Sequence, residues 1–310
     1  MMLVRDVVIH TNEGLFQDSE RLIYSELAPR DRFNLSDDLW VGKLDEGVAD
    51  AVFDACEPPG LFLKKPMRQY GQLYAFVRER APAEPPNEHV WDSDSLLQMC
   101  VALSRLVHPT SISFRYAARI ICTDNENEKD EKIVPGPVAG HGADVYVPTE
   151  GHRDWLIAGD LDALKLLVHH MALSHVPPRV WRALWYHEYA ARTWHLDVRW
   201  TLISTALEAL VHTDRNNSTR QFTKRVSQVA NELAGCEFGE DDAEAAYDLR
   251  SSLSHGRGLP VSANETQDLY ERMETVLRQT LVRCIREADI AAIFSNDETI
   301  RQRLPLSLAR

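Results

Sequence analysis

An arginine and a histidine stand five positions apart in the stretch YDLRSSLSHG, which covers residues 247–256. An arginine guanidinium can hold two oxygens of a phosphate at once, and a histidine can give or take a proton near neutral pH. Arg250 and His255 therefore carry the groups that cleavage of RNA by its own 2′-hydroxyl needs: positive charge at the phosphate and a proton-transfer group. This chemistry requires no metal ion and no cofactor.

The spacing alone does not identify a site, because it also occurs at Arg5 and His10 and at Arg182 and His187. Only the copy at Arg250 and His255 follows two further segments, ALEALV at residues 206–211 and RQFTKRVSQVA at residues 220–230. The neighbouring segments therefore carry more information than the spacing.

In order and spacing, these three segments resemble the Apea-like branch of the HEPN superfamily, over roughly residues 185–290. The resemblance implies a small helical bundle that forms a homodimer. Many members are metal-independent ribonucleases of toxin–antitoxin or antiviral defence systems. The R-x4-6-H motif of the family would make Arg250 and His255 the catalytic pair. Ser251 follows the arginine where many members carry Asn, Asp or His.

Three nearby residues are candidates for supporting roles. Glu208 interrupts the apolar segment LISTALEALV, and such a carboxylate needs a cationic partner, which Arg225 or Arg250 can supply. We expect Glu208 to orient that partner. Tyr247 and Ser251 lie closer to Arg250 around a helix than His255 does.

Geometry sets a condition on the pair. Five residues at about 100° each place Arg250 and His255 about 140° apart around a helix, so they converge only if the helix unwinds at Gly256 or if two copies meet at a two-fold interface. The competing interpretation is structural: His255 interacts with the last carbonyls, Gly256 is a left-handed cap, and Arg250 pairs with an acid. The alternative to a ribonuclease is thus a non-catalytic dimerisation or partner-binding module.

The formal net charge of −13 opposes broad binding to nucleic acid. A local basic patch is nevertheless predicted around residues 215–225, with RNA as the substrate. The residues expected to contact RNA are Arg220, Lys224, Arg225 and Arg257.

Other residue clusters predict packing rather than chemistry. The histidine spacings match no H-E-x-x-H or similar ligand set, so no metal site is expected at His169, His170, His175, His187 and His195. Core or dimer-interface packing is the expected role of Trp181, Trp185, Trp194 and Trp200. Nucleotide-binding and kinase motifs are absent from the sequence.

Composition predicts a globular cytoplasmic protein. The 310 residues are 44% hydrophobic and 26% charged, and no stretch approaches the ~20 apolar residues of a membrane span. The charged N-terminus does not resemble a signal peptide. The five cysteines are scattered without a C-x-x-C pair, which indicates reduced thiols.

The predicted organisation is an α+β domain followed by an all-α HEPN-like helical bundle. Residues 1–158 form the first domain, of unknown family and with a proposed sensor role for a trigger ligand or an antitoxin. Residues 159–295 form the bundle, and residues 296–310 a C-terminal tail. In the first domain we expect a strand at residues 111–121, where alternate residues are apolar, after a helix at residues 95–106. Polar loops are expected at residues 80–88 and 125–142, and weaker strands near residues 8 and 145.

In the second half, helices are predicted at residues 161–174, after the prolines at 177 and 178, and after Asp197. Further helices are expected to begin at Ser218 or Thr219, at Asp241 or Asp242, and after Pro260.

Overall fold

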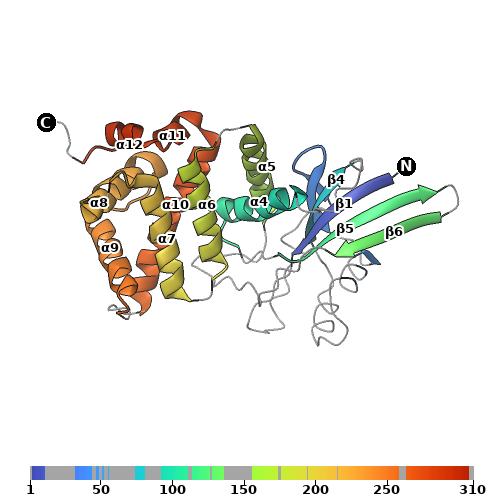
Figure 1. Cartoon of the computed structure of the whole chain (residues 1–310), viewed down its shortest axis with the longest axis horizontal. Coiled ribbons are helices and arrows are strands. Elements are labelled where there is room, and N and C mark those ends of the chain that lie inside the picture. The colour runs from blue at the N-terminus through green and yellow to red at the C-terminus, as the bar shows by residue number, and fades with distance from the viewer. Residues whose placement is uncertain are drawn as a thin grey trace. The chain divides into compact units, whose positions relative to one another are not determined.

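The computed structural model describes residues 2–10, 32–43, 47–48, 51, 55, 74–80, 92–110, 114–125, 128–135, 156–173, 176–193, 195–214, 216–257 and 263–306 (Figure 1). Contacts divide the chain into two compact units, one of residues 1–148 and 152–169, the other of residues 149–151 and 170–310. The predicted boundary at residues 158 and 159 falls at the start of helix α5 (Ala158–Leu173).

The first unit contains an antiparallel sheet. Among the described residues it has six strands in the order β2-β3-β4-β1-β5-β6. Their bounds are β1 (Met2–His10), β2 (Arg32–Asn34), β3 (Leu39–Lys43), β4 (Tyr74–Arg80), β5 (Phe114–Asn125) and β6 (Glu128–Pro135). In β5, Ala118 and Ile120 are buried while Arg119 and Ile121 are partly exposed, so the predicted alternation is confirmed where side chains are described.

Helix α4 (Asp92–Val107) contacts strands β1 and β4. It begins slightly before the predicted helix, and the predicted apolar face is confirmed because Leu97, Cys100, Leu103 and Leu106 are all buried. Together with the sheet, this helix confirms the α+β character predicted for the N-terminal part.

The prediction of a long loop from residue 125 onward is wrong for Asn125 and for residues 128–135, which lie in strands. β5 and β6 form a hairpin in which Asn125 pairs with Glu128 and Ile120 with Ile133. The backbone N–H and C=O groups of this polar segment form hydrogen bonds between β5 and β6. β6 is an edge strand, and charged side chains on an edge strand protect against pairing with other chains. The predicted strand near residue 145 and the loop at residues 81–88 lie outside the described residues.

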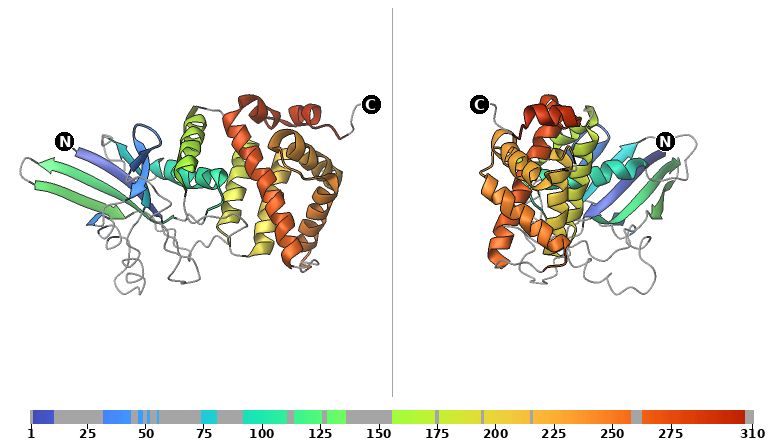
Figure 2. Two further views of the ribbon diagram at one scale, coloured as in Figure 1. Left: turned by 180° about the vertical axis from the view of Figure 1, so that it is seen from behind. Right: turned by 60° about the vertical axis from the view of Figure 1, so that its left-hand side comes forward.

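The second unit is a helical bundle, as predicted. Figure 1 and Figure 2 show its helices side by side, with α10 running past α6 and α7. Its elements are α6 (Pro178–Ala191), α7 (Leu196–Val211), α8 (Ser218–Gln228), the π-helical turn η1 (Val229–Ala234), α9 (Glu240–Ser254), α10 (Ala263–Arg286), α11 (Ala288–Ile293) and α12 (Asp297–Arg303).

Local signals explain most helix ends. Pro178 occupies the first turn of α6, where its missing N–H costs nothing. Gly235, with φ 65°, ends η1 in the left-handed conformation. The predicted start of α7 is displaced: His195 precedes the helix, and Asp197 lies in its first turn. Likewise Asn217, with φ 56°, precedes α8.

The core of the bundle is formed around α7 and α10. Trp200 is fully buried, and its ring lies 6.0 Å from that of Tyr270. The predicted packing role is therefore confirmed for Trp200. Trp181 and Trp185 stack along α6 with ring centroids 6.5 Å apart. Within the described residues, no helix is both long and apolar enough to cross a bilayer.

The segment predicted as a C-terminal tail is folded in part. Helix α12 belongs to it, and Ile300 and Leu304 are buried. Their burial shows that α12 and Leu304 pack against the bundle.

Candidate functional site

Arg250 on α9 is held by Glu208 on α7. Arg250 Nη2 donates to Glu208 Oε2 at 2.8 Å, and the two side chains are 26% and 18% exposed. Of the two partners considered for Glu208, the structure selects Arg250. The ion pair fixes a guanidinium that still reaches the surface.

Aromatic rings support the same side of α9. The guanidinium carbon of Arg250 lies 5.8 Å from the ring centroid of Tyr247, and that ring packs at 5.3 Å against Phe222 of α8. Contact with an aromatic face is favourable for a guanidinium and restricts its rotamers. Tyr247, Arg250 and Glu208 therefore form one group, as expected from their types.

His255 lies at the end of α9, where the helix stops in a regular way. Gly256 adopts φ 71° and donates to the Leu253 carbonyl at 3.0 Å, while Arg257 donates to the Ser252 carbonyl at 3.0 Å. These two bonds form a Schellman cap. The cap interpretation of Gly256 is thereby confirmed, and the helix does not unwind before Ser254.

Because the helix is regular, the side chains of Arg250 and His255 leave α9 in different directions. Their positions lie about 140° apart around α9, with a rise of about 7.5 Å along it. His255 is exposed, whereas Arg250 faces Glu208. Within one chain, the described backbone therefore does not direct the two side chains to a common point. Ser251 is partly exposed, and its carbonyl accepts from the N–H of His255.

Arg225, expected to contact RNA, is instead part of the core and only 2% exposed. Its Nε donates to the Leu304 carbonyl at 2.9 Å, and its Nη1 donates to the Val211 carbonyl at 2.8 Å and to Gln221 Oε1 at 2.9 Å. Burial lowers the pKa of the guanidinium. The expectation of RNA contact is corrected because the donors are directed at backbone carbonyls inside the bundle.

The other residues predicted to contact RNA are at least partly exposed, and two of them have hydrogen-bond partners within the chain. Lys224 Nζ donates to Glu240 Oε1 at 2.6 Å, so its charge is largely balanced. Arg220 is exposed and donates to the Leu306 carbonyl at 3.5 Å. Arg257 is exposed after the cap of α9, and Arg215 lies outside the described residues.

The second Arg–His spacing of the bundle, at Arg182 and His187, leads to a buried cluster. His187 Nε2 lies 2.8 Å from Glu274 Oε1 on α10, and Arg278 Nε lies 3.2 Å from the same oxygen. Burial by itself raises the pKa of Glu274, but the bond to His187 and the charge of Arg278 outweigh it and hold that pKa below its usual value. His187 is thus packed, as predicted. Among the described residues, no three His, Cys, Asp or Glu side chains are grouped so as to hold a metal ion.

Two hydrogen-bonded groups were not predicted from the sequence. Gln221 is fully buried and links Thr213, Asp214 and Arg225, which closes the turn between α7 and α8. Arg272 makes two hydrogen bonds to Asp242, at 2.7 and 3.0 Å, across 30 positions of sequence. A polar residue inside an amphipathic helix was the available signal for Gln221, whereas nothing local marks a pair so far apart in sequence.

Comparison of the chain with protein-family models, curated proteins and solved structures finds no match. The resemblance to the HEPN superfamily therefore rests on the three sequence segments alone.

Proposed function

We propose that the helical unit is a metal-independent endoribonuclease of HEPN type, with Arg250 and His255 as its catalytic residues. The observation that carries this proposal is the partly exposed Arg250, oriented by Glu208 and supported by Tyr247, on the same helix as an exposed histidine. A fixed guanidinium is suited to hold a phosphate, and an accessible imidazole is suited to move a proton.

The proposed reaction is transesterification followed by product release. A base removes the proton of the RNA 2′-hydroxyl, and the oxygen attacks the adjacent phosphorus. The P–O5′ bond breaks, and an acid protonates the leaving 5′-oxygen, so the products are a 2′,3′-cyclic phosphate and a 5′-hydroxyl. Arg250 stabilises the charge on the non-bridging oxygens, and His255 performs one of the two proton transfers.

Because the two side chains leave α9 in different directions, the complete site is proposed to lie at a two-fold dimer interface. In one chain they leave α9 about 140° apart, and the Schellman cap keeps the end of the helix regular. In a two-fold dimer each residue type occurs twice, so Arg250 of one copy can meet His255 of the other. The proposal therefore includes a homodimer.

Cleavage of a single-stranded RNA in the presence of a metal chelator tests the activity. We expect 2′,3′-cyclic phosphate ends, and a loss of about 100-fold or more in His255→Ala, because general acid–base catalysis contributes on that scale. Glu208→Gln should lower kcat about tenfold, since Arg250 loses its orientation. The matched control is Arg182→Ala, which removes an exposed arginine from the copy of the spacing at Arg182 and His187. Activity that persists in the double variant Arg250→Ala, His255→Ala would rule out the proposal.

Subunit complementation tests the shared site. Arg250→Ala and His255→Ala chains with different tags are co-expressed, and the mixed dimer is purified. A site built from two copies leaves one intact site of two, so about half of the wild-type activity is expected. An inactive mixed dimer, or an active monomer, would contradict the two-copy arrangement.

A non-catalytic dimerisation or partner-binding module is the second candidate. The ion pair of Arg250 and the capped end of α9 favour it, because both are complete without a substrate. Expression in cells separates the two. Growth arrest that requires both Arg250 and His255 supports a ribonuclease toxin or defence effector, with the N-terminal unit as the proposed sensor of a trigger or antitoxin. Normal growth, with a lower melting temperature in Arg250→Ala, supports the module.

A further inference from the structure

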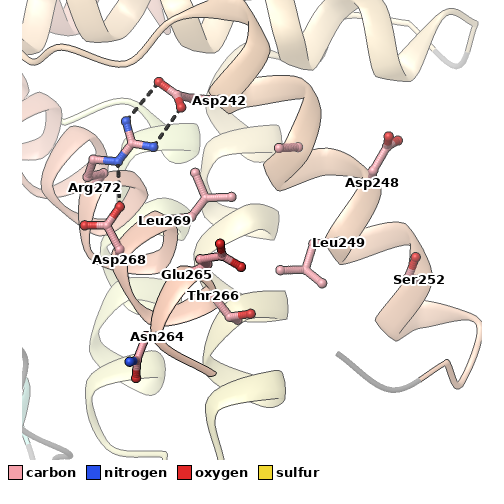
Figure 3. A pocket seen from close by; sticks show the side chains of 11 residues that line it. Asp242, Asp248, Leu249, Ser252, Asn264, Glu265, Thr266, Asp268, Leu269 and Arg272 are labelled. Atoms are coloured by element: carbon pink, nitrogen blue, oxygen red, sulfur yellow. Dashed lines mark hydrogen bonds and ion pairs between the residues drawn. The ribbon is translucent and has the colours of Figure 1, made fainter. Parts of the chain in front are cut away.

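A groove lies between α9 and the first turns of α10, with a volume of about 730 Å³ (Figure 3). Ala245, Leu249 and Ser252 line it from α9. Residues three and four positions apart share one face of a helix, and this face is not the one that carries Arg250. The groove is therefore separate from the proposed ribonuclease site, and its size is that of a small-molecule pocket.

The inner wall of the groove is apolar. Leu249 projects from α9 toward α10, and Leu269 lies opposite on α10 (Figure 3). Leu269 is partly exposed and Leu249 is 4% exposed, so Leu269 offers the larger open apolar surface. Such a wall is suited to methylene groups rather than to a compact hydrated ion.

The polar lining is strongly acidic. Among the described residues that line the groove, Arg272 is the one cation, and the carboxylates are Asp242, Asp248, Glu265 and Asp268. Arg272 is already bound to both oxygens of Asp242 and lies 3.4 Å from Asp268. The guanidinium therefore does not offer an anion site, and the lining has a net negative charge.

The N-terminus of α10 does not reverse this charge. A helix N-terminus carries roughly half a positive charge, which is less than one carboxylate contributes. The electrostatic preference of the groove is therefore for a cation.

Thr266 provides an independent sign of a ligand. It lines the groove and projects from α10 toward α9 (Figure 3). Its residue is 1% exposed, and its Oγ1 has no hydrogen-bond partner. A buried hydroxyl without a partner is unfavourable, and an ammonium group in the groove would supply the missing donor.

We propose that the groove binds an aliphatic polyamine, whose ammonium groups pair with Asp248 and Glu265 and donate to Thr266, while its methylene groups contact Leu249 and Leu269. Alternating charge and methylene segments match a groove with an acidic rim and an apolar wall. A metal ion lacks the apolar part, and the described residues hold no metal-ligand cluster.

Calorimetric titration of the full chain with spermidine tests the proposal. We expect saturable binding at one site per chain. The double variant Asp248→Asn, Glu265→Gln should weaken binding about tenfold or more, because charge-assisted hydrogen bonds are lost. Thr266→Val should weaken binding by a few-fold without lowering the melting temperature, since it replaces an unpaired hydroxyl by a methyl group of the same shape.

A matched control removes the same charge elsewhere on α9. Asp241→Asn, Glu244→Gln changes two exposed carboxylates that do not line the groove, and it should bind spermidine as the wild type does. Equal weakening in both double variants would show a general counterion effect and overturn the proposal. The absence of saturable spermidine binding would also overturn the proposal, as would binding of tetralysine without binding of spermidine. Binding is measured without RNA, so its outcome is independent of the nuclease assay.

Discussion

Replacing Arg225 with methionine should destabilise the helical unit by about 3 kcal/mol, the usual scale for breaking a buried charged network. The guanidinium donates hydrogen bonds to the Val211 carbonyl at the end of α7 and to the Leu304 carbonyl just after α12. It also donates to the side-chain oxygen of Gln221. Methionine retains much of the apolar contact of the arginine stem but leaves the Leu304 and Val211 carbonyls without their donor. The cost is therefore set by unpaired polar atoms rather than by an empty volume.

Thermal unfolding followed by far-ultraviolet circular dichroism measures this cost. For a unit of this size, about 3 kcal/mol corresponds to a decrease of about 10 °C in Tm. Arg220→Met is the control, because Arg220 is exposed and makes one long hydrogen bond, and its change should stay within about 0.5 kcal/mol. An Arg225→Met protein with the same Tm as the wild type would refute the structural role of this guanidinium, and RNA contact by Arg225 would have to be reconsidered.

Three further predictions concern the cap, the buried acid and the thiols. Gly256→Ala should cost about 1 kcal/mol in urea unfolding, because φ is 71° there; a neutral change would contradict the cap. The pKa of Glu274 is lowered from 4.5 in the folded state, so its contribution to stability is present above pH 4.5 and is lost as the pH falls through the folded-state value. Acid unfolding of Glu274→Gln should therefore be less steep, and an identical profile would contradict this linkage. Burial raises the pKa of Cys100 and Cys284 to about 12, so iodoacetamide at pH 8 should modify neither before unfolding, as mass spectrometry can check.

Much of the fold was predictable because its signals are local. The apolar period of residues 95–106 and the alternation around Ile120 can be recognised within a few residues of the chain, and both are confirmed. Pro178 and Gly256 likewise act through their own backbone conformations. Helix starts were less accurate, since several polar residues near each start compete as caps.

The candidate site was predictable in its composition but not in its arrangement. Glu208 and Arg250 were both identified, yet the choice between Arg225 and Arg250 as the partner of Glu208 depends on the packing of α7, α8 and α9. The burial of Arg225 was not recognised, because a basic residue in an amphipathic helix is normally solvated.

The sequence by itself determined the helical second half, the α+β first part and the presence of an arginine and a histidine on one helix, since periodicity and caps act over short distances. Tertiary structure alone decided that Asn125 and residues 128–132 lie in paired strands, that Arg225 is buried, and that α9 has an acidic groove on one face and the Glu208–Arg250 pair on another. The last two depend on contacts between segments distant in sequence, and the β5–β6 pair extends a sheet in which β5 also pairs with the distant strand β1. Such contacts form only when the whole unit packs. A buried charge is stable only if the groups that surround it after folding pair with it, and a short stretch of sequence does not specify those groups.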